Sequence, residues 1–352
     1  MPQEKRQEGR ASRRVAMIRA RLRALVAVEW RPKAKADWGA GGAAGLALAV
    51  PLLAGTAVGH PDAGIALLLP VVLVAMPLPP GAGLRERARR LAVRAAWITT
   101  AGLYAYVTEE QPWALVPAVA VAAGVGALLP KAGYTPALAV LLIGISSHSG
   151  AFGFPGLPQL VGALWGGVLT LPRWGKSALA DPVPAPGPSD IARRLRHAWR
   201  TGLVVGGAAA VMAALRGLTG EGHWLITGIL LTLTPTPTGT RLKARQRIVG
   251  NTLGGVAAAL VLLVDPGPWV GAAVVGVSGI LAYGLRPANY LYWCLAFPLP
   301  LLLITDFGRL TPWYTAAVRA GMVLAGSIVA VLATHWLWPT TREPSRRTGP
   351  GN

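Results

Sequence analysis

The chain has 352 residues, of which 53% are apolar and 14% are charged, and its formal net charge is +20. Soluble domains carry roughly 25% charged residues, so this composition argues against a soluble protein and favours one that crosses a membrane. The single cysteine, Cys294, excludes an intrachain disulfide framework and a thiol-based metal site.

The first 37 residues are polar and basic. Within them, residues 11–30 space apolar side chains at helical intervals with arginines between them, which is typical of a helix lying on a membrane surface. Such a helix attracts anionic lipid, and a docking site for a protein partner is the alternative. The start is too long and too polar for a signal peptide, so we expect no cleaved signal.

Apolar runs recur through the rest of the chain, and a run of about 17 to 25 residues crosses a bilayer as a helix. We therefore predict an all-α integral membrane protein with about 12 transmembrane helices. The expected spans are 39–58, 64–78, 92–108, 113–129, 134–149, 157–172, 199–218, 223–236, 246–264, 269–285, 287–305 and 313–338.

The charges test this assignment. Nearly all of the 34 Lys and Arg residues fall in alternate connections, while carboxylates such as Asp62, Glu221 and Asp306 fall in the others. The positive-inside rule then places both termini in the cytoplasm. It also explains the basic charge as a topological signal. With no aromatic and basic recognition module in the chain, we do not expect nucleic-acid binding.

An internal repeat aligns unusual residues at a constant offset of 156 positions. The aligned pairs include Pro79 with Pro235, Gly83 with Gly239, and Tyr134 with Tyr290. This indicates two homologous halves of six helices each. An even number of spans makes the repeat parallel, with a pseudo-two-fold axis along the membrane normal and a site near the interface of the halves. We expect the second half to supply more polar groups, because the first half has alanines at the equivalents of Asn251 and Thr252.

The expected domains follow from the repeat and from composition. They are a basic cytoplasmic segment (1–37), a first six-helix half (38–176), a proline-rich cytoplasmic linker (177–197), a second six-helix half (198–340) and a cytoplasmic tail (341–352).

No hydrolase elbow, Walker A loop or HExxH motif is present, and the histidines do not have the spacing of metal ligands. We therefore expect no enzyme activity, no catalytic residues, no cofactor and no metal.

The strongest single candidate is Arg319, about two turns inside the last span. An arginine within the membrane costs several kcal/mol unless it is paired or hydrated, so it marks a functional site by default, and an anionic substrate would suit it. The alternatives are a side chain that reaches the outer interface and an ion pair with Asp306.

Four further residues complete the predicted substrate-binding site or path: Asn251, Thr252, Trp224 and Arg247. Asn251 and Thr252 are polar groups inside a span, and they could equally bond a neighbouring helix. Arg247 could instead anchor the cytoplasmic end of its helix.

Proline breaks are the other candidate feature. Pro298 and Pro300 interrupt the eleventh span, and Pro235 with Pro237 ends the eighth. A broken helix frees backbone groups that protein, water or substrate must satisfy, so such breaks often flank a binding site. Irregular packing without function is the alternative.

Four glycine pairs have GxxxG spacing, which indicates close helix packing. They are Gly41/Gly45, Gly162/Gly166, Gly202/Gly206 and Gly250/Gly254.

The stretch around the second proline turn resembles the membrane domain of the fusaric-acid-resistance-like (FUSC) family. An apolar helix beginning His-Trp leads into a proline and glycine turn and then into TRLKARQRIVGNTLGG. The matching residues are Trp224, Pro235, Gly239, Thr240, Arg247, Gly250, Thr252 and Gly254. The segment from Arg319 through Gly326 to Trp338-Pro339 also resembles that domain's final helix. The resemblance covers about 197–340.

This resemblance implies a multi-pass inner-membrane transporter that exports aromatic or other organic acids. Aromatic-acid efflux pumps and plant aluminium-activated malate channels are relatives of the family. Unlike the efflux pumps, this chain has no large cytoplasmic domain between or after its halves. The resemblance therefore leaves the substrate and a periplasmic adaptor open.

We thus predict export of an organic anion, driven by the proton gradient because the chain has no nucleotide-binding motif. The alternatives are a passive organic-anion channel and a non-transporting scaffold that holds a partner through its basic N-terminal helix. Expected partners are the small organic anion and anionic membrane lipids, and homo-oligomerisation stays open.

Overall fold

A computed structural model describes residues 30–76, 78, 82–108, 111–129, 132–146, 154–172, 188–215, 217, 221–264, 266–305 and 314–337. The chain divides into two compact units, Met1–Arg31 and Pro32–Asn352, and the following concerns the second unit. The predicted surface helix at 11–30, the linker residues 177–187, Asp306 and the tail 341–352 lie outside the described residues.

The described residues form helices and no strand, which confirms the all-α prediction for this part of the chain. In the first half the helices are α2 (Trp38–Ala57), α3 (Pro61–Val74), α4 (Leu84–Val107), the 3₁₀ turn η1 (Pro112–Ala114), α5 (Leu115–Leu128), α6 (Thr135–Ser146) and α7 (Leu157–Thr170). In the second half they are α8 (Pro188–Ala214), α9 (His223–Thr232), α10 (Pro237–Leu263), α11 (Pro268–Leu285), α12 (Tyr290–Ala296), α13 (Pro298–Thr305) and α14 (Tyr314–Trp336).

The helices of the two halves correspond in order and in packing. Moving α4 along the chain by 156 residues places it on 240–263, within α10, and the same shift places η1 and α5 on 268–284, within α11. Between the halves, α2 packs against α11 and α5 packs against α8. Within the first half α3 packs against α7, and in the second half the corresponding helices α9 and α14 pack against each other. In the same way α4 contacts α6 in the first half, and α10 contacts α12 and α13 in the second.

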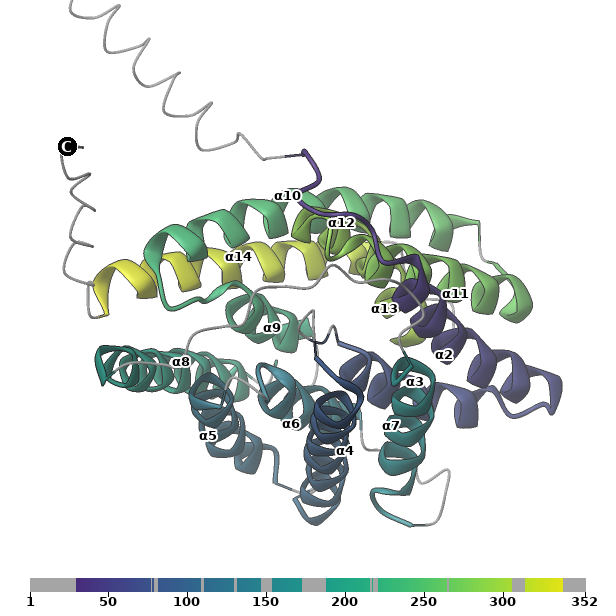
Figure 1. Ribbon diagram of the computed structural model, residues 1–352, viewed down its shortest axis with the longest axis horizontal. Coiled ribbons are helices and arrows are strands. Elements are labelled where there is room, and N and C mark those ends of the chain that lie inside the picture. The colour runs from purple at the N-terminus through teal and green to yellow at the C-terminus, as the bar shows by residue number, and fades with distance from the viewer. Residues whose placement is uncertain are drawn as a thin grey trace, which may run out of the picture. The chain divides into compact units, whose positions relative to one another are not determined.

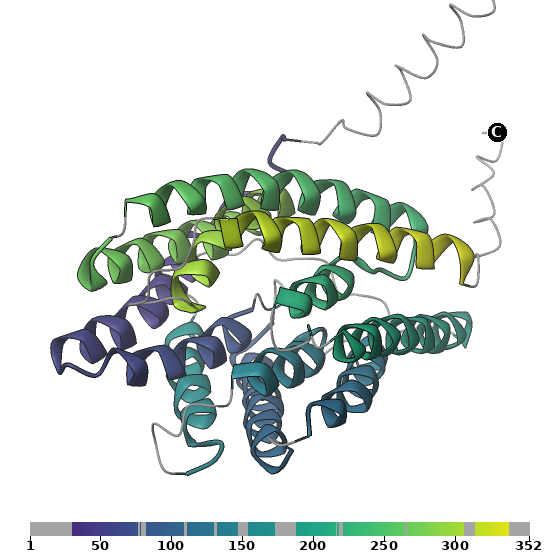
Figure 2. The same ribbon diagram turned by 180° about the vertical axis from the view of Figure 1, so that it is seen from behind.

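Figures 1 and 2 show this arrangement. Helices α10 and α14 lie alongside each other on one side of the unit, α4 to α7 lie on the other, and α9 lies between them. Every residue of α9 except Leu225 is buried. A short helix that is apolar around most of its circumference has to be enclosed on all sides, which explains its central position. One hydrophobic core joins side chains of both halves, among them Leu48, Ile98 and Ile229.

Four of the described helices are long and apolar enough to cross a membrane, judged by length and composition: α2, α10, α11 and α14. Six shorter apolar helices accompany them: α3, α5, α6, α7, α9 and the stretch Tyr290–Ile304. Each of the twelve predicted spans thus corresponds to a helix or a pair of short helices. Six of them are shorter than a full span. Two others, α4 and α8, are long but have arginines in their first turns.

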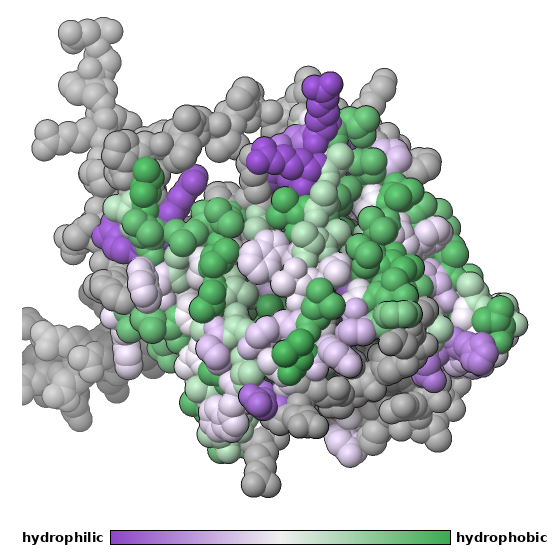
Figure 3. All heavy atoms as spheres, turned by 90° about the horizontal axis from the view of Figure 1, so that it is seen from below, coloured by the Kyte–Doolittle hydropathy of each residue, from purple (hydrophilic) through white to green (hydrophobic). Residues whose placement is uncertain are grey.

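The outer faces of the long helices fit a lipid environment. Leu253, Val256 and Leu260 form a stripe on α10, and each is at least 46% exposed. Figure 3 views the side away from α10, and there too hydrophobic residues are exposed among weakly polar ones, with hydrophilic residues near the margins. Water penalises extensive exposed apolar surface, so such surface is rare on soluble monomers.

The basic clusters are helical, which corrects the expectation that they form loops. Thr236 caps α10, its hydroxyl accepting from the Gly239 amide at 3.2 Å, and Pro237 takes the first helical position. Residues 241–247 therefore lie inside α10. Likewise 85–94 lie in α4, and residues 188–197 of the predicted linker lie in α8. Hydropathy predicts only the part of a helix that lies in the apolar layer. The helix itself continues through the arginines beyond that layer, because arginine is a good helix former.

Several of these arginines close the carboxyl ends of other helices. Arg94 donates to the carbonyls of Val74, at 3.0 Å, and Met76, at the end of α3. Arg200 donates to the Thr234 carbonyl at 2.6 Å, just after α9. Helix ends carry unpaired carbonyls and a negative partial charge, so buried guanidinium groups stabilise them. These arginines thus have a structural role as well as a topological one.

The glycine pairs pack closely, as their spacing predicts. Gly41 and Gly45 face α11, and the other pairs face α3, α5 and α12. A Cβ at Gly41 would lie 2.6 Å from the Ile280 carbonyl oxygen, whereas a Cβ at Gly42 would meet nothing within 4 Å. Close approach of α2 to α11 therefore depends on Gly41 and not on its neighbour.

We predict that Gly41→Ala destabilises the protein by about 1–3 kcal/mol, because the methyl group would force the two halves apart. Gly42→Ala is the matched control, and it should leave stability unchanged or raise it by up to about 1 kcal/mol through helix propensity. Thermal unfolding in detergent, followed by circular dichroism, measures both. Equal effects of the two substitutions would contradict the close packing of α2 on α11.

Candidate functional site

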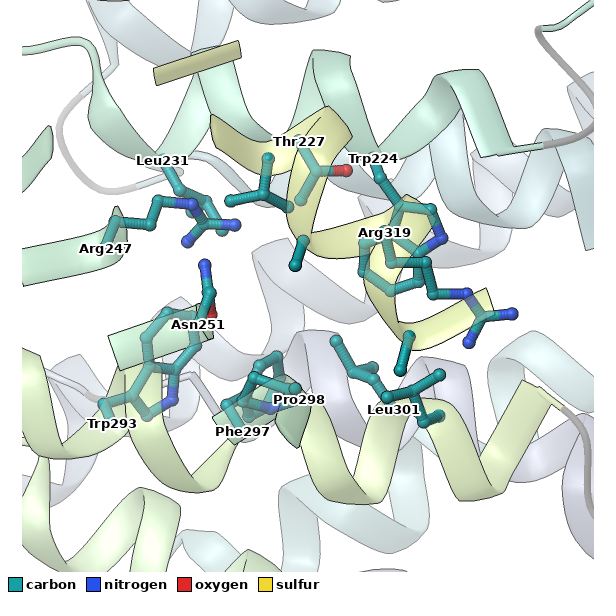
Figure 4. A pocket seen from close by; sticks show the side chains of 15 residues that line it. Trp224, Thr227, Leu231, Arg247, Asn251, Trp293, Phe297, Pro298, Leu301 and Arg319 are labelled. Atoms are coloured by element: carbon teal, nitrogen blue, oxygen red, sulfur yellow. The ribbon is translucent and has the colours of Figure 1, made fainter. Parts of the chain in front are cut away.

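A pocket lies within the second half, between α9, α10, α12, α13 and α14 (Figure 4). Its lining includes four of the five predicted site residues: Trp224, Arg247, Asn251 and Arg319. Its volume is about 50 Å³. One buried water needs about 10–15 Å³ on this measure, so the pocket in this conformation has room for a few waters.

One end of the pocket is formed by α10. Arg247 and Asn251 are four residues apart and therefore share one face of the helix, and Figure 4 shows their nitrogen atoms facing each other. Arg247 is only 4% exposed, and its Nη1 donates to the Tyr290 hydroxyl at 3.3 Å. That hydroxyl in turn donates to the Leu231 carbonyl at 3.3 Å, so the guanidinium is tied to α9 through Tyr290.

Arg319 on α14 marks the other end. Its Nε lies 3.1 Å from a carboxylate oxygen of Glu221, and its guanidinium lies over the Trp224 ring, 5.3 Å from the centroid. The sequence offered Asp306 as a partner, but Asp306 lies outside the described residues. Among the described residues, Glu221 at the turn before α9 forms an ion pair with Arg319. An ion pair with a partly solvated carboxylate lowers the cost of placing an arginine at this depth.

Hydrogen-bond donors without an acceptor distinguish this pocket. The Nε of Arg247, Nδ2 of Asn251 and the indole nitrogens of Trp224 and Trp293 are buried, and none has a hydrogen-bond partner among the described residues. All four side chains line the pocket. A buried unsatisfied donor costs about 1–3 kcal/mol, and native proteins hold few of them. A ligand with several acceptor oxygens would satisfy this set.

The remaining walls are apolar and aromatic. Trp293 stacks on Phe297 with ring centroids 4.4 Å apart, and Leu301, Leu302 and Val323 complete the surface. Flat rings and aliphatic side chains of this kind suit the hydrocarbon body of a small organic molecule.

The predicted proline break of the eleventh span is present, and it helps to build the pocket. The span divides at Phe297 into α12 and α13, and Pro298 lines the pocket at the start of α13. Pro300 lies within α13 and outside the lining. Pro235 and Pro237 lie in the turn from α9 to α10, away from the pocket.

Threonines hold that turn together. The Thr234 amide donates to the Thr240 hydroxyl at 3.0 Å. The Thr334 hydroxyl of α14 donates to the same Thr240 hydroxyl at 3.4 Å. The turn therefore has a structural explanation.

Thr252 is not brought to the site. It lies on the exposed face of α10 and does not line the pocket. Successive residues of an α-helix point about 100° apart, and here Asn251 faces the pocket while its neighbour Thr252 is exposed. Asn251 therefore shares the pocket with Arg319, and Thr252 does not.

The first half has no polar counterpart of this pocket at the equivalent positions. The residues 156 positions before Trp224, Arg247, Asn251, Trp293 and Arg319 are Leu68, Leu91, Ala95, Ala137 and Ala163, and all five are buried. Apolar side chains thus fill this place in the first half. The observation agrees with the expectation that the second half supplies more polar groups.

Sequence reasoning missed Glu221 and Trp293 as parts of the site. Glu221 reads as one of several carboxylates at an outer boundary, and Trp293 as one of 13 tryptophans in an apolar chain. Tyr290 carried a signal, since it aligns with Tyr134 in the repeat, but nothing in the sequence ties it to Arg247.

Comparison with known proteins supports the family resemblance. Residues 206–333 match the family described as "Fusaric acid resistance protein-like", which confirms the resemblance inferred over 197–340. Together with the apolar helices, this match fits a multi-pass membrane protein and, in general terms, a membrane transporter.

Two curated proteins are similar over 144 residues, or 41% of this chain. One is "Uncharacterized protein ORF2" of Neisseria gonorrhoeae, 27% identical, and the other is an "Uncharacterized protein" of Haemophilus influenzae, 26% identical. The matched stretch spans 34% and 20% of the lengths of these relatives. No solved structure matches the chain.

Thiol accessibility tests the pocket. Cys294 is the sole cysteine and is fully buried, so the unaltered protein should resist a small methanethiosulfonate reagent. Ala320→Cys places a thiol in the pocket lining and should react at least about tenfold faster than Ala330→Cys, which is on the same helix but fully buried. Mass spectrometry measures the labelling. Equal rates for the two variants would show that the pocket is closed to small solutes.

Proposed function

We propose that this chain, whose residues 206–333 belong to the fusaric acid resistance protein-like family, is a membrane transporter for organic acids. One observation carries the proposal. The buried polar atoms of the pocket lining that lack a hydrogen-bond partner among the described residues are all donors, and the lining contains two arginines. Carboxylate oxygens accept hydrogen bonds only, so an organic anion complements this lining where a cation or an amine would not.

The stacked Trp293 and Phe297 rings favour an acid with a planar, apolar body. We therefore propose that the carboxylate meets Arg247 and Asn251 and that the body lies against these rings. A pocket of about 50 Å³ has to widen before it admits a whole acid. The break at Phe297 is the place where α13 can move relative to α12, because Pro298 and Pro300 have no amide hydrogen to bond back to α12.

For the membrane arrangement we propose two parallel six-helix repeats, with both termini in the cytoplasm and the chain in the inner membrane. The matching order and packing of the helices in the two halves support the repeat. The concentration of arginines in the first turns of α4, α8 and α10 supports the orientation. Export of the acid and coupling to the proton gradient belong to the same proposal, as do anionic lipids as partners of the basic N-terminal segment. No enzyme activity is proposed.

Two alternatives differ from this proposal in measurable ways. A passive anion channel would carry current without a proton gradient and without saturation. A scaffold would move no acid, and deleting residues 1–30 would abolish its function while only reducing that of a transporter. The built pocket favours transport over the scaffold.

We predict that Arg247→Gln raises the KM for benzoate transport in proteoliposomes by roughly 10- to 100-fold. The substitution removes a charge-assisted hydrogen bond of about 1.5–3 kcal/mol, and each 1.4 kcal/mol corresponds to tenfold. Arg245→Gln removes the same charge two residues earlier on α10, outside the pocket lining, and should leave the KM within about twofold.

Uptake and efflux of labelled benzoate, with pH gradients imposed in either direction, measure both variants. Equal KM values for the two variants would remove Arg247 from the site. Absence of transport of benzoate and of a panel of aliphatic acids by the unaltered protein would overturn the proposed function.

A further inference from the structure

We infer that Glu221 couples the binding of an organic anion to the uptake of a proton, by competing with the anion for Arg319. The inference rests on the proposed function, since it concerns the same pocket. It assigns a role to a residue outside the sequence motif that begins at His223.

The geometry places the carboxylate where it would compete. Glu221 Oε2 lies 3.1 Å from Nε of Arg319, a guanidinium that also lines the pocket. The Arg319 side chain is 11% exposed and that of Glu221 is 31% exposed, so water reaches the carboxylate more readily than the guanidinium. The Trp224 ring beneath Arg319 also restricts where a second carboxylate can approach.

The surroundings leave Arg319 as the main described cation that faces Glu221. On α9 itself the nearest titratable group is His223, whose ring stacks on Trp224 at 4.8 Å. The adjoining end of α8 presents Met212, beside Gly222, while the described cations of α8 are near its beginning, where Arg200 bonds to Thr234. Helix α6 contains no charged residue, and Arg247 of α10 lies at the far end of the pocket (Figure 4). Arg216, between α8 and α9, lies outside the described residues.

The competition follows from the charges. Arginine keeps its proton in proteins, so Arg319 stays cationic throughout. A substrate carboxylate that approaches while Glu221 is ionised would place two like charges beside one guanidinium, which favours protonation of one of them. The balanced step is that ionised Glu221, one proton and one anion give neutral Glu221 and the anion bound at Arg319. No bond other than the O–H bond of Glu221 forms.

This coupling has a definite sign. Proton and anion bind together, so each anion that crosses with Glu221 protonated takes one proton in the same direction. Export then proceeds when the acid accumulates inside, whereas a more acidic outside favours entry. Export driven by proton entry would need the opposite sign, with proton and anion excluding each other. The inference therefore replaces that part of the proposed function by outward movement of the acid together with a proton.

Isothermal titration calorimetry of the full-length protein with benzoate tests the inference. Titrations between about pH 6 and pH 8, in buffers of different ionisation enthalpy, report how many protons are taken up per benzoate bound. The unaltered protein should take up a proton on binding, and its Kd should rise with pH, by up to about tenfold per unit. Glu221→Gln mimics the protonated state, and it should bind benzoate with no proton uptake and with a Kd that does not change with pH.

Two further variants serve as controls. Glu221→Asp keeps a titrating carboxylate and should retain proton uptake. Glu86→Gln removes an acid that pairs with Arg90 on α4 and should bind benzoate with the proton uptake of the unaltered protein. Benzoate binding without proton uptake by the unaltered protein, or unchanged proton uptake in Glu221→Gln, would overturn the coupling while leaving the proposed function intact. Failure of the unaltered protein to bind benzoate or any aliphatic acid would overturn both.

Discussion

An unpaired hydrogen-bonding group in an apolar interior costs about 1–3 kcal/mol, and this constraint organises much of the protein. Where helices end inside the structure, arginines supply the missing partners: Arg94 closes α3 and Arg200 binds just after α9. Where the chain turns between α9 and α10, a group of threonines bonds the freed backbone. Where helices approach closely, glycines such as Gly41 keep their own backbone hydrogen bonds and remove the side chains that would separate the helices. In the pocket of the second half, four buried donors lack a hydrogen-bond partner among the described residues.

Several positions that line the pocket in the second half have buried apolar residues as their equivalents, 156 positions earlier, in the first half. In the first half, leucines and alanines occupy the positions of the pocket and belong to the core, as Leu68 and Ala163 do. In the second half, Trp224 and Arg319 stand at those two positions, and a pocket is present. Because core side chains pack at the density of a crystal, exchanging small apolar residues for larger polar ones changes the packing as well as the chemistry.

The pocket combines two kinds of cation that differ in their restraints. Arg247 is buried and tied to α9 through Tyr290, so it offers a fixed charge. Arg319 is paired with Glu221. In the coupling proposed above, Arg247 would supply affinity, and Arg319 would link affinity to the protonation of Glu221. The break at Phe297 lies between these two ends and separates α12 from α13.

The sequence by itself determined the class of protein, the all-helical fold of the described residues and the family resemblance of residues 206–333, because hydropathy, the charge pattern and the motif around Gly250 are local properties. It also identified Arg319, Arg247, Asn251 and Trp224, since polar or aromatic groups in an apolar run stand out. It could not decide that Asn251 rather than Thr252 faces inward, because helix rotation is set by what packs on each face. Nor could it pair Arg319 with Glu221 or place Trp293 and Arg247 in one pocket, since these residues lie on different segments of the chain. Hydropathy also misplaced the ends of α8 and α10, because helices continue beyond the apolar layer. Only the tertiary structure, which fixes how helices rotate and meet, decided which donors share a pocket and which carboxylate pairs with its arginine.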